Sequence, residues 1–112
     1  MQFSKKNEVY RIILLSGAQN NILGVSFGEF NSDKIEVIEW AVGENCKVKT
    51  SKEEVLEQVL SGLESVNKSM DTNYKLSKIY FSPSDKASNS VYKLLICKLI
   101  RHYHDGKEFK EI

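Results

Sequence analysis

The sequence has little of several residue types that mark specialised proteins. Its 112 residues include one proline, Pro83, two cysteines, Cys46 and Cys97, and one tryptophan. So little proline excludes a proline-rich linker, and two cysteines without a C-x-x-C motif supply no zinc-ligand set. One disulfide is arithmetically possible, but two reduced thiols in the cytoplasm are the simpler interpretation.

Long hydrophobic runs and an excess of one charge are also missing. The apolar run 12–15 is too short for a signal peptide, and Lys93 and Lys98 interrupt the apolar region 91–100. No stretch approaches the roughly 18 apolar residues of a membrane span. A net charge of +1 excludes a strongly basic or strongly acidic binder. We therefore expect one cytoplasmic domain, 1–112, with no membrane partner.

Three predicted strands come first, over 9–16, 22–30 and 34–42. Each is rich in β-branched or aromatic residues and is bounded by short polar turns, which favours an antiparallel meander. In the third strand the apolar phase shifts between Val37 and Ile38, which predicts a β-bulge.

The second of these strands has a face of small residues, formed by Gly24, Ser26 and Gly28. Small residues in a strand let another segment pack closely against it. One alternative function is therefore a subunit of a larger assembly that uses this face as a contact.

A helix is predicted over 52–70, because its apolar residues recur at helical spacing. Two overlapping capping boxes precede it, Thr50 with Glu53 and Ser51 with Glu54.

A fourth strand over 74–82 and a second helix over 92–103 complete the pattern. The first helix can act as a crossover, which allows the fourth strand to pair in parallel beside 9–16. The predicted fold is α+β with the order β-β-β-α-β-α, a four-stranded mixed sheet and two helices. The predicted core comprises Ile12, Leu14, Val25, Phe27, Ile38, Trp40, Leu56, Leu60, Leu63, Ile79, Phe81, Leu95, Leu99 and Tyr103.

This element order is also that of the compact half of a ribonuclease-H-like fold. Such enzymes hold divalent metals with acidic residues on the first strand, on the first helix and after the fourth strand. The helix supplies Glu53, Glu54 and Glu57, and Asp85 follows the fourth strand, but the centre of the first strand, 12–14, has no acid. Asp85 also suits a helix N-cap. A ribonuclease-H-like nucleic-acid-binding protein is therefore an alternative function rather than the leading one.

Other residues of catalytic or metal-binding type have simpler interpretations. His102 and His104 point about 200° apart on a helix, which predicts a cationic helix end rather than a metal site. Cys97 lies among apolar residues with no base nearby in the sequence, which predicts a buried, inert thiol. We therefore expect a chain that is not an enzyme and that has no metal and no cofactor.

The small net charge hides a division along the chain. Residues 29–64 have a net charge of −5, and the remainder has a net charge of +6. Since the basic residues are few and no stacking motif of the ribonucleoprotein type occurs, we expect a protein partner rather than nucleic acid. An acidic surface suits a basic partner such as a nuclease toxin. The predicted partner-binding residues are Glu36, Glu39, Glu54, Glu57 and Glu64. The second helix, with Lys93, Lys98 and Arg101, is the alternative binding face.

Three segments resemble a family of small bacterial β-β-β-α-β-α domains of unknown function. The family's Phe-Gly-Asp-Tyr-Asp corresponds to residues 27–31, Phe-Gly-Glu-Phe-Asn, and its Val-Leu pair to Val55-Leu56. Its Gly-Ser and its arginine-rich run ending in Tyr correspond to the region 82–93, where serines replace the arginines at about positions 88 and 90. The size and single-domain build also resemble immunity and antitoxin proteins of bacterial toxin systems. That resemblance implies a protein that neutralises a toxin by covering its active site.

Overall fold

The computed structural model describes residues 1–16, 19–28, 34–40, 48–85 and 90–112. Within these ranges the chain forms two helices and six strands, so the predicted α+β class is confirmed. In chain order the elements are β1 (Gln2–Lys6), β2 (Val9–Ser16), β3 (Gln19–Phe27), β4 (Glu36–Glu39), α1 (Lys52–Met70), β5 (Leu76–Phe81), α2 (Val91–His104) and β6 (Lys110–Glu111).

The strands form one mixed sheet in the order β4-β5-β3-β2-β1-β6, so the prediction of four strands was wrong. The two additional strands, β1 and β6, lie together at one edge, where β6 pairs in parallel with β1. Their sequences carry little signal. Phe3 is the only apolar residue of β1, and β6 consists of two charged residues, so neither shows the alternation that marks a strand.

Strand β5 lies between β3 and β4, which corrects the predicted topology. It pairs antiparallel with β3 and parallel with β4. The third predicted strand therefore does not extend a meander, and the fourth does not lie beside 9–16. Helix α1 connects β4 to β5 as the crossover that two parallel neighbours require. A ribonuclease-H-like sheet, in which the fourth predicted strand pairs with the first, is not the sheet that this chain forms.

Strand β4 carries apolar residues on both faces, which explains the phase shift seen in the sequence. Val37 packs against the core, whereas Ile38 alternates to the opposite face. All four residues of β4 pair with β5 in unbroken register, so the predicted bulge at this point was wrong. An irregularity does occur in the sheet, between Ser26 and Phe27 of β3.

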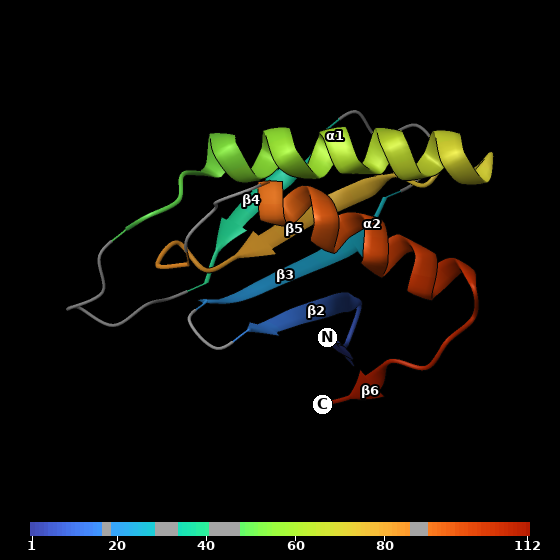
Figure 1. The fold of residues 1–112 in the computed structure, drawn as a ribbon, viewed down its shortest axis with the longest axis horizontal. Helices are drawn as coiled ribbons and strands as arrows, with labels where there is room; N and C mark the ends of the chain where they lie inside the picture. The colour runs from blue at the N-terminus through green and yellow to red at the C-terminus, as the bar shows by residue number, and fades with distance from the viewer. Residues whose placement is uncertain (17–18, 29–33, 41–47, 86–89) are drawn as a thin grey trace.

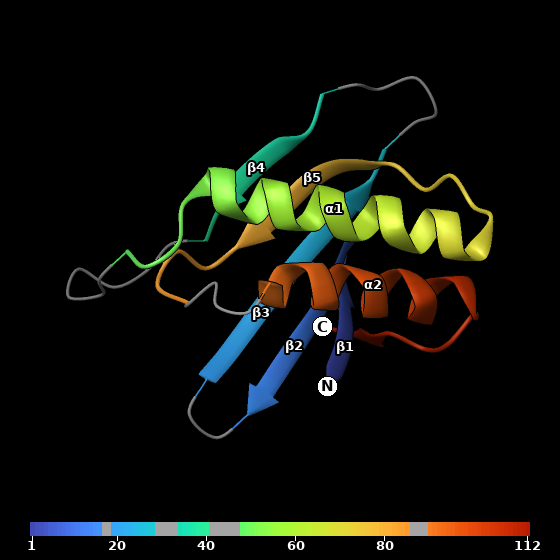
Figure 2. The same cartoon turned by 45° about the horizontal axis from the view of Figure 1, so that its top comes forward.

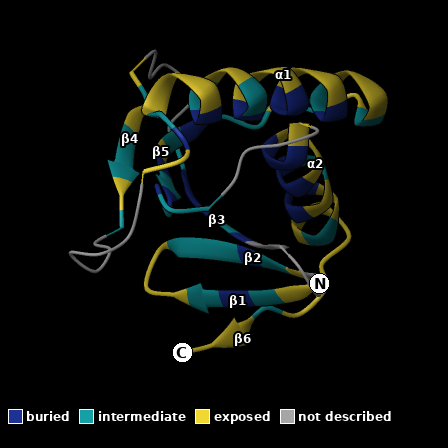
Figure 3. Ribbon diagram, turned by 60° about the vertical axis from the view of Figure 1, so that its left-hand side comes forward, coloured by how far each residue is buried: buried dark blue, intermediate teal, exposed yellow. Residues whose placement is uncertain are grey.

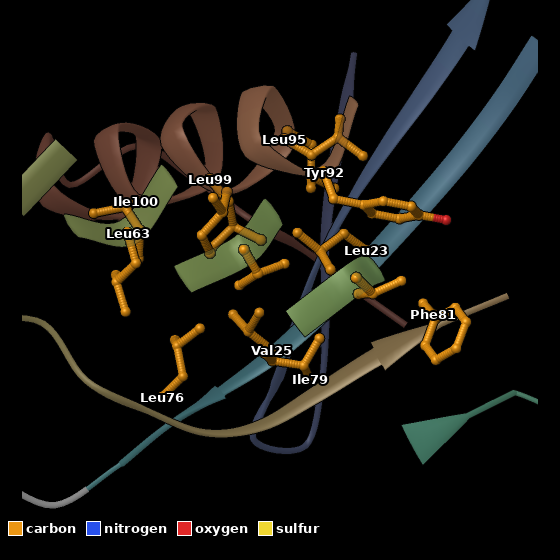
Figure 4. Packing of buried hydrophobic residues seen from close by; sticks show 14 of the residues in the cluster. Leu23, Val25, Leu63, Leu76, Ile79, Phe81, Tyr92, Leu95, Leu99 and Ile100 are labelled. Carbon is orange, nitrogen blue, oxygen red and sulfur yellow. The ribbon is translucent and has the colours of Figure 1, made fainter. Parts of the chain in front are cut away.

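Within the described ranges, both helices cover the same face of the sheet and no helix covers the other face (Figures 1 and 2). The core lies between the helices and the sheet, and Figure 4 shows its side chains converging from both layers. The buried apolar residues are Ile12, Leu23, Val25, Val55, Val59, Leu63, Val66, Leu76, Ile79, Phe81, Val91, Tyr92, Leu95, Ile96, Leu99 and Ile100.

The predicted core agrees with this set in part. Burial is confirmed for Ile12, Val25, Leu63, Ile79, Phe81, Leu95 and Leu99. Leu14, Phe27 and Leu56 are partly buried against the core. The prediction was wrong for Ile38 and Trp40, which lie on the face without helices because they alternate with Val37 along the strand. It was also wrong for Leu60 and Tyr103, whose side chains are 39 % and 37 % exposed.

Local capping explains where α1 begins. Ser51 is its N-cap, and the Ser51 hydroxyl accepts a hydrogen bond of 3.2 Å from the backbone N–H of Glu54. This confirms one half of the second predicted capping box, whereas the Glu54 carboxylate accepts from the Ser51 hydroxyl at 3.4 Å and not from the Ser51 backbone N–H. Thr50 does not form the first box, because its hydroxyl donates to the backbone carbonyl of Asp85. Helix α2 begins after Ser90, whose side chain makes no capping hydrogen bond. The prediction that Asp85 caps this helix was therefore wrong.

Candidate functional site

The outer side of α1 presents an acidic stripe, which we define as Glu53, Glu57 and Glu64. All three side chains are exposed, and Figure 3 shows the outward side of this helix as solvent-facing. Glu57 and Glu64 are seven residues apart, so they lie two turns, or about 10 Å, from each other along nearly the same line. Glu54 is also exposed, at the N-terminal end of the same helix. The structure thus places the three predicted α1 residues, Glu54, Glu57 and Glu64, on one solvent-facing surface.

Leu60 is an apolar side chain within this acidic stripe. It follows Glu57 by three residues and precedes Glu64 by four, and these are the spacings of neighbours on a helix surface. The side chain is 39 % exposed, although Leu60 lies three residues before the buried Leu63, a spacing typical of neighbours on one side of a helix. Leu60 lies just beyond the apolar side of α1 that packs on the sheet. The periodicity of the sequence does not show at which residue that apolar side ends.

The two predicted residues on β4 lie on different faces of the sheet. Glu36 and Glu39 are both exposed, but they are three positions apart in a strand and therefore point to opposite faces. Glu39 is on the face covered by the helices, as is Val37. Glu36 is on the other face and lies across the strand pair from Lys78. The prediction that all five glutamates form one surface was therefore wrong for Glu36.

Asp85, considered above as a metal ligand, is engaged within the fold. One of its carboxylate oxygens accepts a 3.3 Å hydrogen bond from the backbone N–H of Ile22, and its carbonyl accepts the hydrogen bond from Thr50. Burial raises the pKa of the Asp85 carboxyl, while the Ile22 hydrogen bond and the charge of Lys49 act in the opposite direction. In the part of the chain that the structure describes, no group of three or more His, Cys, Asp or Glu residues lies close enough to hold a metal ion.

Tyr92 forms a second buried polar group near Asp85, which the sequence analysis missed. The residue is fully buried, and its backbone N–H donates a 3.0 Å hydrogen bond to the side chain of Gln58. Its hydroxyl lies beside Asn21 and Thr50 but makes no hydrogen bond of good geometry with a described residue. Burial raises the pKa of Tyr92 to about 12, so its hydroxyl stays protonated at neutral pH.

Replacing Asp85 by asparagine is expected to stabilise the protein at neutral pH. The folded-state pKa of Asp85 lies above the unfolded value of 3.8, so ionisation opposes folding as the pH rises above that value. Asparagine keeps an oxygen that can accept the Ile22 hydrogen bond and has no charge to desolvate. The gain in the free energy of unfolding of Asp85→Asn should be largest at pH 7 and should disappear as the pH falls toward 3.8.

Urea denaturation at several pH values measures this difference. The matched control is Glu64→Gln, which removes a charge from an exposed position on α1 and should show no such trend. A variant at Asp85 that is less stable than the parent protein at pH 7 would show that the ionised carboxylate stabilises the fold, contrary to this expectation.

The two histidines near the end of α2 have separate partners. The ring of His102 stacks on Phe3 with centroids 3.7 Å apart, and its Nε2 lies 2.7 Å from the carbonyl of Glu108. The Nδ1 of His104 lies 2.8 Å from the hydroxyl of Tyr74. The two imidazoles therefore contact different parts of the chain.

Cys97 is half-buried, and its thiol contacts the carbonyl of Gly62 at 3.3 Å. Burial raises the pKa of this thiol and outweighs the charges of Arg101 and Lys93, so the protonated form predominates at neutral pH. The second cysteine, Cys46, lies outside the described residues, as do the turn over 31–33, positions 29–31 of the family-like segment and position 88.

The small-residue face of β3 is occupied by the chain itself. The indole of Trp40 lies against Gly24, where a Cβ atom would be 3.0 Å from Cη2. Ser26 donates its hydroxyl hydrogen to the carbonyl of Glu8 at 3.1 Å, and a Cβ on Gly28 would be 3.1 Å from the backbone of Leu76. The close packing predicted here is therefore intramolecular, which removes the support for an assembly contact at these residues.

Trp40 forms a cluster with Tyr80 and Arg11 on the sheet face without helices. The ring of Tyr80 stacks on the indole, with centroids 5.8 Å apart and planes at 18°. The guanidinium carbon of Arg11 lies 5.3 Å from the indole centroid. Tyr80 and Arg11 pair with Gly24 from its two sides, so the indole edge over Gly24 lies between them. Sequence analysis missed this cluster because Arg11, Trp40 and Tyr80 are far apart in the chain and are brought together by a strand order that was predicted wrongly.

Comparisons of the chain with protein-family models, curated protein sequences and solved structures give no match. The resemblance to small bacterial domains therefore stays a prediction. Neither helix in the described ranges has the length and apolar character needed to cross a membrane.

Proposed function

We propose that this chain is a non-enzymatic protein-binding module that docks a basic partner on the outer side of α1. The observation that carries the proposal is the position of Leu60, an exposed apolar side chain with Glu57 and Glu64 on either side of it along the helix. Protein interfaces gain most of their binding energy from a few central side chains that are surrounded by polar groups. Leu60 has the position of such an anchor, and the acidic stripe has the position of its rim.

The charges of this surface favour one kind of partner. Complementary potentials accelerate encounter and reject partners of the wrong sign, and α1 presents carboxylates along its outer side. Domains that act on nucleic acid present basic surfaces, because they must attract phosphate. We therefore propose a basic toxin domain as the partner, with the chain acting in the cytoplasm as an immunity or antitoxin protein that covers the toxin's active site.

Reversing the charge of the stripe is expected to weaken binding about 100-fold or more. The test titrates this chain by calorimetry against a purified basic toxin domain that binds the parent protein. The double variant Glu57→Lys/Glu64→Lys places two like charges against the basic partner, and the single variant Leu60→Asp removes the anchor. Either change should cost at least about 2.8 kcal/mol of binding free energy, since each factor of ten is about 1.4 kcal/mol.

The matched control is Glu36→Lys/Glu111→Lys, which makes the same change in net charge at exposed positions away from α1. This control should bind as the parent protein does, apart from a small change in association rate. Equal losses in the two double variants would reduce the effect to net charge and would contradict a docking site on α1.

A further inference from the structure

The sheet face without helices carries a concentration of basic side chains that their positions in the sequence do not reveal. Strand register places one continuous row of residues across all six strands on this face. From edge to edge, the row is Ile38, Tyr80, Gly24, Arg11, Ser4 and Lys110. Adjacent strands lie about 4.8 Å apart, so the row from Tyr80 to Lys110 is about 19 Å long.

The charges on this face are mainly positive. The paired strands direct the basic side chains of Lys6, Arg11, Lys78 and Lys110 to this face. The acidic side chain that they direct to it is that of Glu36. Lys6, Lys78 and Lys110 are exposed, and Glu36 lies beside Lys78. The face therefore has an excess of cations that extends across the sheet.

Arg11 is held in place without an anionic partner among the residues that the structure describes. Its guanidinium lies over the indole of Trp40, and its cross-strand neighbours on this face, Gly24 and Ser4, are both uncharged. Its Nε is buried with no hydrogen-bond partner among the described residues, and the same holds for the hydroxyl of Ser4. A guanidinium that is stacked on a ring is oriented in advance, which lowers the cost of binding a phosphate with its outer nitrogens.

Aromatic and apolar surface accompanies these cations. Tyr80 and Trp40 are only partly buried, and Leu15, which lies four residues after Arg11 on the same face of β2, is 55 % exposed. Aromatic rings on an open sheet face, next to basic side chains, are what single-stranded nucleic acids use for stacking and for phosphate contacts. An acidic protein segment would use the cations but would have no comparable use for the rings.

We propose that this sheet face binds single-stranded nucleic acid, with Arg11 contacting a phosphate and the partly exposed ring of Tyr80 contacting a base, while Trp40, which lies between Tyr80 and Arg11, senses the contact. The proposal goes beyond the docking function of α1, because it concerns the opposite face of the molecule. Double-stranded nucleic acid is not the ligand, since its bases are not free to contact rings on a sheet surface.

Trp40 provides a direct readout, because it is the only tryptophan of the chain. Titration of the full chain with oligouridine or oligodeoxyuridine of about ten nucleotides should quench its fluorescence to saturation. The logarithm of the affinity should fall with the logarithm of salt concentration with a slope of about −2 to −3, as expected for about four cations and a single strand. The two oligomers distinguish RNA from DNA as the preferred ligand.

Three variants test the placement. Arg11→Gln should lower the affinity about tenfold, as expected for the loss of a charged hydrogen bond. Since Arg11 also packs on Trp40, the exposed Lys78→Gln is a second variant with less influence on the fold, and it should make the salt slope less steep by about 0.7. The matched control is Lys98→Gln, which removes the same charge from the exposed side of α2.

The outcomes separate the alternatives. Loss of affinity in Arg11→Gln and a reduced slope in Lys78→Gln, with Lys98→Gln unchanged, support the proposal. Equal effects in Lys78→Gln and Lys98→Gln would overturn it in favour of unspecific attraction. Polyglutamate of similar length that quenches Trp40 and binds as tightly as the oligonucleotides would overturn it in favour of an acidic protein ligand. The absence of any saturable change in Trp40 fluorescence would also overturn it.

Discussion

Replacing Gly62 by alanine is expected to lower the free energy of unfolding by about 2 kcal/mol, although alanine is the better helix former. A Cβ at this position would overlap Cγ2 of Ile96 and lie 2.7 Å from the carbonyl oxygen of Lys93. Forcing a methyl group into such a contact costs about 1–3 kcal/mol or more, against a gain of up to about 1 kcal/mol in helix propensity. Because one contact is to the backbone of α2, the helices themselves have to move apart.

The consequence is measurable as a decrease of roughly 8–12 °C in Tm, since about 1 kcal/mol corresponds to at least about 4 °C for a domain of this size. The matched control is Ser61→Ala, one position earlier on the exposed side of α1. This substitution raises helix propensity without a new contact, so the control should be as stable as the parent protein or slightly more stable. If Gly62→Ala stabilised the protein to the same extent as Ser61→Ala, the close approach of α1 and α2 would be wrong.

The same glycine illustrates what the sequence could reveal and what it could not. A glycine in the middle of a helix lowers helix propensity by about 1 kcal/mol, so its presence within 52–70 signals that something requires it. The helix itself was predictable from its apolar periodicity and from Ser51 with Glu54. Its partner was not, because periodicity identifies an apolar side of a helix and not the element that covers it.

Strand pairing was the part of the fold that local sequence did not determine. The segments that became β2, β3, β4 and β5 were all recognised as strands, because each carries its own pattern of β-branched and aromatic residues. Their order depends on long-range contacts that no local pattern records, and β5 took the position between β3 and β4. This error carried over to the predicted core, where Ile38 and Trp40 were assigned to the wrong face.

The candidate surfaces were predictable to different degrees. The acidic residues of α1 were identified because helical spacing alone places Glu57 and Glu64 on one side. The basic face of the sheet was not identified, since Arg11, Lys78 and Lys110 are far apart in the chain and converge only through strand register. Counting charges along the sequence therefore led to a protein partner as the leading expectation, with a nucleic-acid-binding protein only as an alternative.

Phe81→Ala is expected to have the largest effect on stability of any substitution considered, a loss of about 3–5 kcal/mol. Phe81 is fully buried on the core face of β5, and truncation of a buried phenylalanine leaves a cavity that the surroundings fill only in part. Since domains of this kind are stable by about 5–15 kcal/mol, the variant should be close to unfolding at room temperature. Tyr80→Ala, on the opposite face of the same strand, should cost less than about 1.5 kcal/mol, because Tyr80 is only partly buried.

A conservative pair of substitutions tests the strand order directly. Phe81 and Leu23 are cross-strand neighbours on the core side of β5 and β3, so Phe81→Leu and Leu23→Val should be coupled by at least about 0.5 kcal/mol in a double-mutant cycle. If β5 lay beside β2, as the sequence suggested, Phe81 would instead couple to a residue of β2 such as Leu14. Urea denaturation of the single and double variants measures both cycles. Coupling of Phe81 to Leu14 without coupling to Leu23 would contradict the sheet order, and with it the row of side chains on which the nucleic-acid site depends.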